Sequence, residues 1–173
     1  MIDYRLQERG RIAEAKFREL LDAQDLNHET TNQMPNTFSK KVRECGGKRA
    51  DIQALIPDVG WVKFDVKNRK FDPEYRNFTF NEEEIRKLEV LEGISHMPVW
   101  LAISNESVFH ETWYLVPVAE LADEQYWRFN PNTRESFVAI STTECKLVNQ
   151  STSISLTCQA YYAAAFRYDG DAA

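Results

Sequence analysis

The sequence has 173 residues, of which 43% are hydrophobic and 28% charged, the balance of an ordinary globular protein with a sizeable core. No apolar run approaches the roughly 20 residues that span a bilayer, and residues 1–11 lack the apolar segment of a secretory signal. The cysteines, three in all, lie far apart, which favours free thiols in a reducing compartment over a disulfide framework. We therefore expect a single cytoplasmic domain over residues 1–173.

The net charge of −6 is distributed unevenly along the chain. Residues 1–76 contain 15 basic and 13 acidic side chains, whereas residues 77–173 contain 6 basic and 14 acidic ones. The stretch SKKVRECGGKR, residues 39–49, has five basic residues and one acid. A local basic patch can guide a phosphate backbone even on an acidic protein, so the net charge leaves a nucleic-acid partner open.

The first predicted element is an amphipathic helix over residues 8–24, ERGRIAEAKFRELLDAQ. Its apolar residues recur at helical spacing, with polar residues between them: Ala13, Phe17, Leu20 and Leu21. The polar segment that follows, residues 27–48, contains a proline and a pair of glycines. This segment is predicted to be a loop with one short strand at 37–44.

Residues 49–70 are predicted to form an antiparallel β-hairpin. In ADIQALI and in WVKFDVK the residues alternate between two faces with the period of two that marks a strand. The intervening PDVG supplies turn chemistry, because proline presets φ, aspartate bonds to its own backbone and glycine tolerates positive φ. A three-residue loop places Asp51 opposite either Asp65 or Lys67. Either register puts these three polar residues together on one face of the hairpin.

A second helix is predicted over residues 79–93, TFNEEEIRKLEVLEG. A capping-box pattern marks its start, formed by Asn81 with Glu84 or by the pair two residues earlier. Gly93 suits the C-terminal end of the helix. The run of acids at its beginning is explained by the positive end of the helix dipole, so we assign it no catalytic role.

Three further segments complete the predicted fold. Residues 98–104, PVWLAIS, form a continuous apolar run typical of a strand buried on both faces. Residues 112–121 predict a strand that Pro117 interrupts, which places it at or near an edge of the sheet. Residues 141–158 have β character, and the tail 168–173 is expected to be loose. The order helix, strands, helix and buried strand predicts an α/β domain with a mixed central β-sheet flanked by helices.

The polar residues of the hairpin form a set suited to metal-dependent chemistry. Two carboxylates that lie close together raise each other's pKa unless positive charge lies between them. A hard divalent cation resolves this repulsion, and Mg²⁺ binds through one or two carboxylates while it keeps several waters. A lysine on the same strand face could orient or deprotonate the attacking water, or neutralise charge on phosphorus. Asp51, Asp65 and Lys67 therefore predict a site for metal-assisted phosphodiester hydrolysis.

A further acid comes from the first helix. Glu14 precedes Phe17 by three residues and Leu21 by seven, which places it at the rim of the apolar face. A glutamate at this edge could reach the same metal. A solvated position at the edge of the helix is nearly as good an interpretation of Glu14 taken alone.

This arrangement resembles the PD-(D/E)xK nuclease superfamily, with a helical Glu14, then Asp51, and DVK at 65–67 after a gap of thirteen residues. The helix GRIAEAKFRELL is similar to the first helix of small archaeal Holliday-junction-resolvase-like endonucleases. The resemblance covers about residues 8–120. It implies a restriction-endonuclease-like αβββαβ core, followed by a C-terminal extension at 121–173 for which the resemblance offers no counterpart.

The resemblance also implies Mg²⁺-dependent cleavage of DNA, with Mn²⁺ as a substitute metal. The implied site consists of Asp51 and Asp65 as metal ligands, Lys67 as the catalytic lysine, Glu14 as an auxiliary acid and ligand, and Gln53 as a supporting residue. A homodimer is expected by analogy, because resolvases and restriction enzymes cut two strands with paired subunits. The sequence departs from the family at residues 49–50, which are Arg-Ala, so the proline that names the motif is absent. Some resolvase-like members also carry a glutamine on the second helix, where this chain has Glu82, Glu83 and Glu84.

Basic residues near the hairpin are candidate nucleic-acid contacts, although a solvated loop explains most of them almost as well. These candidates are Lys40, Lys41, Arg43, Lys48, Arg49 and Arg69. The competing interpretation of Asp65 and Lys67 is a surface ion pair on an exposed sheet face, worth about 0–1 kcal/mol. Asp51 at the matching register, together with Glu14, favours a functional site.

The favoured function is therefore a metal-dependent endonuclease acting on DNA, with branched DNA among the candidate substrates. A non-catalytic nucleic-acid-binding or assembly subunit on the same scaffold is the alternative from a different class. Within the enzymes, no sequence feature separates junction resolution from a restriction-like or RNA-directed nuclease. No histidine or cysteine has the spacing of a zinc site.

Overall fold

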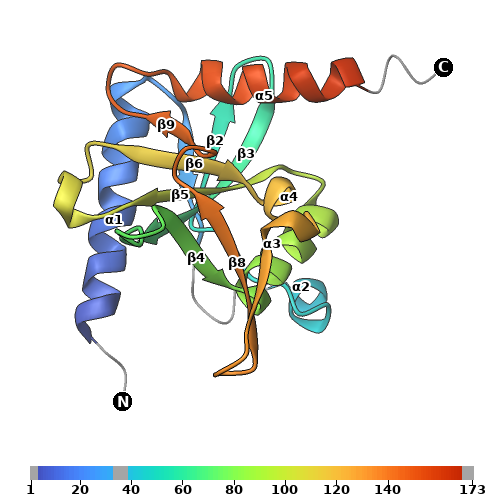
Figure 1. Ribbon diagram of the computed structural model, residues 1–173. Coiled ribbons are helices and arrows are strands. Elements are labelled where there is room, and N and C mark those ends of the chain that lie inside the picture. The colour runs from blue at the N-terminus through green and yellow to red at the C-terminus, as the bar shows by residue number, and fades with distance from the viewer. Residues whose placement is uncertain (1–3, 33–38, 169–173) are drawn as a thin grey trace.

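The computed structural model describes residues 4–32 and 39–168, and its largest element is a six-stranded mixed sheet (Figure 1). In spatial order the strands are β1 (His28–Thr30), β2 (Ile52–Ile56), β3 (Gly60–Asn68), β5 (Val99–Ser104), β6 (Trp113–Pro117) and β9 (Lys146–Val148). β3 and β5 run parallel, and every other neighbouring pair is antiparallel. The predicted mixed α/β architecture is confirmed.

One face of this sheet is covered by α1 (Tyr4–Ala23) and α5 (Ile154–Tyr168). The predicted apolar stripe of α1 is buried in that core, and its members are Ala13, Phe17, Leu20 and Leu21. From the sheet, even-numbered residues of β3 such as Phe64 point into the same core, as the period of two requires. The helix predicted at 8–24 is confirmed, and it begins one turn earlier.

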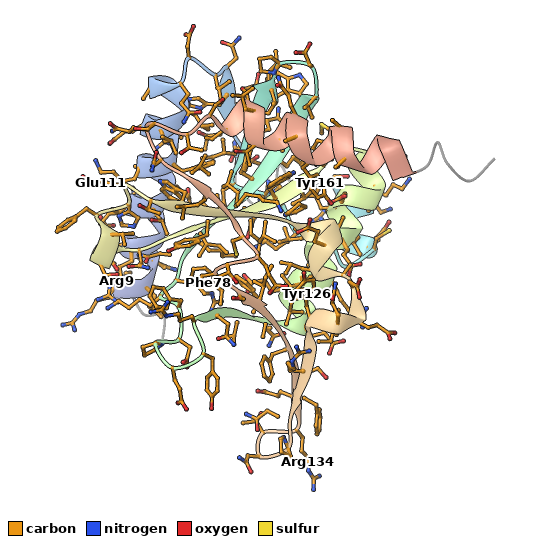
Figure 2. All side chains as sticks on the ribbon, turned by 45° about the horizontal axis from the view of Figure 1, so that its top comes forward. Arg9, Phe78, Glu111, Tyr126, Arg134 and Tyr161 are labelled. Carbon is orange, nitrogen blue, oxygen red and sulfur yellow. The ribbon has the colours of Figure 1, made fainter. Side chains whose placement is uncertain are left out.

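The opposite face is covered by α3 (Glu82–Ser95), α4 (Val118–Leu121) and a second sheet of three strands. Its strands are β4 (Asn77–Asn81), β8 (Glu135–Ser141) and β7 (Trp127–Asn130). The hairpin of β7 and β8 extends away from the body of the molecule, with Arg134 at its tip (Figure 2). Residues 121–168 therefore pack on both faces of the central sheet and, through β9, pair with β6.

The β2–β3 hairpin forms as predicted, and the structure selects between the two allowed registers. Ile52 lies opposite Phe64 and Ala54 opposite Val62, so the same register places Asp51 opposite Asp65. The chain order α1, β1, β2, β3, α3 and β5 reproduces the predicted αβββαβ order, with the short helix α2 (Lys40–Glu44) and β4 inserted. All residues of β5 are buried, which confirms a strand covered on both faces.

Several predicted boundaries are wrong. The strand expected at 37–44 is a helix over Lys40–Glu44, while residues 37 and 38 lie outside the described residues. The first strand is instead β1, in a segment predicted to be loop. Gly93 does not end α3, because His96 adopts the left-handed conformation (φ 52°) that closes the helix after Ser95.

Three more segments differ from their predictions. The strand expected over residues 112–121 ends at Pro117, and residues 118–121 form the helix α4. Residues 79–81, expected in the second helix, extend β4, because their backbone pairs with β8. Within 142–158 β9 is the only strand, and the chain from Ile154 onward is helical, so the β character of SISLTC is overridden by packing on the sheet. Most of the tail predicted to be loose lies outside the described residues. Within those residues, no helix is long and apolar enough to cross a membrane, and the cysteines are free thiols.

Candidate active site

The candidate site lies on the α3 side of β3, where charged residues replace the apolar residues that line the rest of that face. In the parallel β3–β5 register, Asp65 neighbours Leu101 and Lys67 neighbours Ile103. Leu101 and Ile103 belong to the apolar core, yet Asp65 is equally inaccessible, with 0% of its surface exposed. A carboxylate buried to this degree beside an apolar core must be paired with positive charge.

Two lysines supply that charge from different parts of the chain. Lys48 Nζ lies 2.7 Å from Asp65 Oδ1, and Lys67 Nζ lies 2.7 Å from Asp65 Oδ2. The side chain of Lys48 is 29% exposed and that of Lys67 only 14%. Each oxygen of Asp65 thus faces one ammonium group.

Glu84, in the first turn of α3, joins both lysines from the other side. Its carboxylate forms an ion pair with Lys67, and its Oε1 lies 3.9 Å from Lys48 Nζ. Its second oxygen lies 3.3 Å from the guanidinium of Arg69, which stacks over the ring of Phe80. We call Lys48, Asp51, Asp65, Lys67 and Glu84 the acid–lysine cluster. Glu84 was expected to complete a capping box, but its side chain serves this cluster instead.

The backbone around Lys48 explains how a loop residue reaches β3. Gly46 (φ 75°) turns the chain after α2, and its conformation favours glycine. A Cβ on Gly47 would lie 3.0 Å from Val42 and 3.1 Å from Val90 of α3, so only glycine fits without displacement of these side chains. The Lys48 N–H then donates to the carbonyl of Lys87. The loop is therefore held against α3 and directs Lys48 toward Asp65.

The charges in the cluster fix the ionisation of its lysine and glutamate. Burial lowers the pKa of Lys67, but the adjacent Asp65 and Glu84 carboxylates outweigh it and raise that pKa above its ordinary value. Burial raises the pKa of Glu84, but Lys67, Lys48 and Arg69 outweigh it and hold that pKa below its usual range. Lys67 is therefore protonated at neutral pH, which suits it to stabilise negative charge and not to act as a base.

Asp51 is the member of the cluster whose negative charge is disfavoured. Its Oδ2 accepts a hydrogen bond of 2.7 Å from the Val66 N–H, across the hairpin. Burial and the nearby Asp65 carboxylate raise the pKa of Asp51 to about 7, although the Val66 hydrogen bond and Lys48 act in the opposite direction. The Asp65 carboxylate thus acts on Asp51 in the direction that the sequence predicted.

Glu14 lies at the half-buried rim of α1, as predicted, on the helix that covers the opposite face of the sheet. Burial raises its pKa, and the Asp65 charge adds to that rise, while Arg18, Arg11 and Lys67 lower it. Glu14 therefore lies within electrostatic range of the cluster. Its interaction with Asp65 is repulsive in sign.

The aspartate pair fits a hard divalent cation in two respects. Both Asp65 oxygens are buried, and within the described part of the chain neither accepts a hydrogen bond of normal geometry despite the nearby ammonium groups. The charge of Asp51 is also disfavoured where it lies. A cation would relieve both conditions, and Mg²⁺ needs only one or two carboxylates besides its waters.

Across residues 4–32 and 39–168, no group of three His, Cys, Asp or Glu side chains is arranged around a common metal position. Glu14 is therefore not brought into a set of three ligands with the aspartates.

The remaining predicted site residues lie at varied distances from the cluster. Gln53 is bound elsewhere, since its amide nitrogen donates to Glu29 and its oxygen accepts from Lys63. Arg49 donates to the carbonyl of Asn32, and Arg69 joins the cluster through Glu84. The basic residues of α2 are exposed on the surface, and these are Lys40, Lys41 and Arg43.

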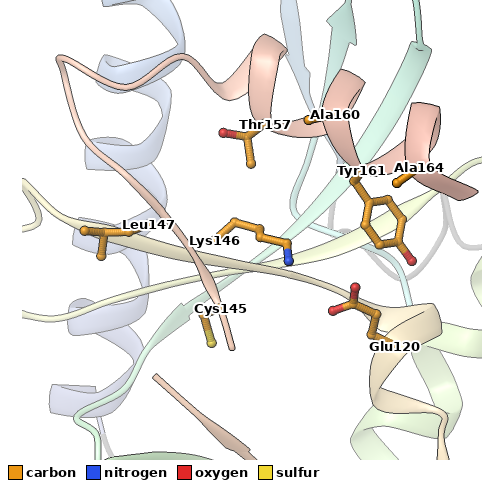
Figure 3. A pocket seen from close by; sticks show the side chains of 8 residues that line it. All are labelled: Glu120, Cys145, Lys146, Leu147, Thr157, Ala160, Tyr161 and Ala164. Atoms are coloured by element: carbon orange, nitrogen blue, oxygen red, sulfur yellow. The ribbon is translucent and has the colours of Figure 1, made fainter. Parts of the chain in front are cut away.

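The surface of the protein has two hollows that differ in their position relative to the acid–lysine cluster. One of about 410 Å³ lies beside Arg69, between β4 and the β7–β8 hairpin, and offers the side chains of Asn81, Thr133 and Ser136. Another of about 820 Å³ lies between β9, α4 and α5, where Lys146, Glu120 and Tyr161 gather (Figure 3). The larger hollow contains no member of the acid–lysine cluster, whereas Arg69, which pairs with Glu84, lines the smaller one.

Sequence reasoning missed the roles of Glu84 and Lys48. Glu84 was explained by the helix dipole, and its signal was its position in the first turn of a helix that follows the DVK strand. Lys48 was grouped with surface lysines, although the adjacent glycine pair indicated a tight turn. Neither signal specifies a partner, because both contacts connect segments far apart in the sequence.

Comparison with known proteins adds a structural likeness and no sequence match. Neither a protein-family model nor a curated protein matches the chain. Among solved structures, the chain is similar to Hjc, a Holliday junction resolvase from the archaeal hyperthermophile Archaeoglobus fulgidus. The two share 15% sequence identity, the match covers 79% of this chain and 85% of that chain, and the TM-score is 0.47. The architecture described above therefore rests on the elements of this chain itself.

Proposed function

We propose that this protein is a metal-dependent endonuclease that hydrolyses phosphodiester bonds in DNA at the acid–lysine cluster. The observation that carries the proposal is the fully buried Asp65, which faces an ammonium group at each oxygen and lies opposite Asp51. Buried charges of this kind are costly to a fold, and replacement by apolar residues is often neutral or stabilising. Perturbed ionisable groups gathered in this way favour a functional site.

Each residue of the cluster has a distinct task in the proposed reaction. Asp51 and Asp65 would hold Mg²⁺, or Mn²⁺ in its place. When bound, such an ion polarises a phosphoryl oxygen and lowers the pKa of a coordinated water. Lys67, protonated and fixed by Asp65 and Glu84, stabilises the negative charge that develops on the phosphoryl group. Glu14 lies close enough to influence the same charges, and it would position water from the α1 side.

The surface beside the cluster suits a nucleic-acid strand. Arg69 presents a half-exposed guanidinium between the cluster and the 410 Å³ hollow. The hollow contains amides and hydroxyls that can bind phosphate and sugar oxygens, together with one carboxylate, that of Glu135. The exposed basic residues of α2 add a second region of positive charge on the same chain. DNA is the proposed substrate, and the two-strand cuts of branched or duplex DNA are proposed to require a homodimer.

The proposal is tested with purified protein and supercoiled plasmid, linear duplex, single-stranded and four-way-junction DNA, each in Mg²⁺, Mn²⁺ or EDTA. Asp65→Asn and Lys67→Met are compared with wild type, and Lys63→Met is the matched control. Lys63 is also a half-buried lysine on β3 and the same face, but its Nζ donates to Gln53 and not to the cluster. Metal-dependent cleavage that is lost in the first two variants and kept in the control supports the endonuclease. Cleavage that persists in all three variants contradicts it.

A second candidate function is a non-catalytic nucleic-acid-binding or assembly subunit. The observation in its favour is that two lysines already neutralise Asp65, and that the described residues contain no ready set of three metal ligands. In this case the cluster is a buried ion-pair network that fixes β3 against α3. DNA binding that is unchanged by Asp65→Asn, with no cleavage of any substrate, would favour this candidate over the enzyme.

A further inference from the structure

The two lysines that contact Asp65 are held unequally. Lys67 forms ion pairs with both Asp65 and Glu84, lies on a regular strand and keeps only 14% of its side chain exposed. Lys48 comes from the loop after α2, is 29% exposed, and its second contact to Glu84 is long, at 3.9 Å. Of the two ammonium groups, that of Lys48 is therefore held more weakly and loses less ion-pair energy when it leaves Asp65.

A lysine ammonium group lies beside each carboxylate oxygen of Asp65. Both carboxylate oxygens are inaccessible to solvent, and each faces one Nζ at 2.7 Å. A cation that reaches Asp65 must displace an ammonium group, because two positive charges within about 3–4 Å of each other on one oxygen repel by several kcal/mol at the effective dielectric of a protein surface.

We propose that Lys48 competes with the divalent cation for Asp65. Its ammonium group occupies the Oδ1 side of Asp65 and moves away when the metal binds. This inference rests on the proposed function, since it concerns the regulation of the same site. The backbone of Lys48 stays anchored through its N–H to Lys87, so only the flexible side chain has to move. The displaced ammonium remains at the mouth of the site, beside Glu84 and Arg69, where a DNA phosphate would enter. Lys48 is thus a positioning residue that sets the metal concentration at which the site is occupied.

The test measures binding of Mn²⁺ alone to the full chain, by isothermal titration calorimetry and by the loss of the free Mn²⁺ signal in electron paramagnetic resonance. Lys48→Met keeps most of the length of the side chain and removes its charge, and Lys48→Gln is the second variant should the first fold poorly. Lys40→Met is the matched control, because Lys40 lies eight residues earlier on α2 and pairs only with Glu44 among the described residues. Thermal unfolding of each variant by circular dichroism establishes that it is folded.

The expected result is that Lys48→Met binds Mn²⁺ about tenfold or more tightly than wild type, the lower end of the range for residues that flank metal ligands. Lys40→Met should bind like wild type, and Asp65→Asn added to Lys48→Met should abolish the gain. A merely structural role for Lys48 would weaken binding or leave it unchanged, and either result overturns the proposal. Absence of Mn²⁺ binding in wild type and in both Lys48 variants also overturns it.

The same experiment separates this proposal from the proposed function. Tighter Mn²⁺ binding by Lys48→Met, with no cleavage of DNA by any form, would keep the competitor and remove the endonuclease. Metal-dependent cleavage with equal Mn²⁺ affinity in wild type and Lys48→Met would keep the endonuclease and remove the competitor.

Discussion

On the side of the central sheet that faces α3, two neighbouring strands are packed differently: β5 with apolar residues and β3 with charged residues. On β5, Leu101 and Ile103 are fully buried against apolar side chains of α3 such as Ile85 and Leu88. One strand away, at the same levels of the sheet, Asp65 and Lys67 fill the same layer with charge. α3 follows this division, with Glu84 over the charged part and its later turns over the apolar part.

This difference suggests that the β5 part contributes mainly to stability and the β3 part to the proposed chemistry. Apolar burial contributes roughly 25 cal/mol per Å², whereas a buried ion pair is weak evidence of stabilisation because desolvation offsets the attraction. The β5 part therefore holds the sheet to α3, and the β3 part is retained at a cost to the fold. If this division is right, substitutions in the two parts should have different readouts.

Leu101→Ala, in the apolar part, should cause a large loss of stability and leave metal binding by the folded protein unchanged. Truncation of a fully buried leucine removes transfer free energy and leaves a cavity, which lowers the free energy of unfolding by about 2–5 kcal/mol. Urea denaturation followed by circular dichroism measures this change. The Mn²⁺ affinity of the folded protein should stay at the wild-type value, and a parallel loss of affinity would contradict the separation of the two parts.

Lys67→Met should have the largest effect on the charged part. Loss of a preorganised positive charge at the reacting group lowers the rate of DNA cleavage by about 10²–10³-fold. Plasmid nicking under single-turnover conditions measures it, with Lys63→Met expected to remain within a few-fold of wild type. Equal losses in both variants would show that β3 lysines matter for folding and not for the chemistry.

Glu84→Gln should reduce cleavage by about tenfold, less than Lys67→Met. Glu84 orients Lys67 and balances Arg69 without the geometry of a metal ligand, and residues in such supporting positions contribute about 10–100-fold. Glu83→Gln is the control, because Glu83 is an exposed neighbour that pairs with Lys87. The substitution should also lower the pKa of Lys67 toward its ordinary value, since it removes one of the two carboxylates that raise it.

The raised pKa of Asp51 should make the free energy of unfolding depend on pH when it is measured in EDTA. Its pKa is raised from 3.8 to about 7 on folding, so between these values the folded state binds more protons than the unfolded chain. The free energy of unfolding contributed by Asp51 is therefore greatest below pH 4, falls as pH rises toward 7 and is level above it, with a slope of up to about 1.4 kcal/mol per pH unit. Asp51→Asn should remove this slope in urea melts between pH 4.5 and 7. An unchanged slope would show that Asp51 is not the group responsible.

Neutralisation of the α2 surface should have the smallest effect. Lys40→Gln with Lys41→Gln should weaken binding of duplex DNA several-fold and reduce the slope of log K against log salt by about one for each phosphate that the variant no longer neutralises. Fluorescence anisotropy over a range of salt concentrations measures this slope in the presence of EDTA. Stability should not change, because both side chains are exposed. An unaltered salt slope would remove α2 from the proposed DNA surface.

Sequence patterns determined the local parts of this protein. The alternation of β2 and β3, the loop between them and the apolar stripe of α1 each follow from residues close together in the chain, so the pairing of Asp51 with Asp65 was within reach of sequence reasoning. The burial of β5 on both faces was likewise indicated by an unbroken apolar run. These features depend on the side-chain periods of helices and strands and on turn chemistry, which act over a few residues.

Only the tertiary structure decided the contents of the cluster and the boundaries of several elements. Lys48 meets Asp65 because the glycine pair packs on α3, and Glu84 turns to Lys67 because α3 begins above β3. The β pairing of residues 79–81 and the helix at Ile154 likewise depend on partners far along the chain. The partner of a charged side chain cannot be read from the local sequence, because long-range packing brings the two remote segments together. The hairpin thus supplied Asp51, Asp65 and Lys67, and the folded chain supplied Lys48 and Glu84.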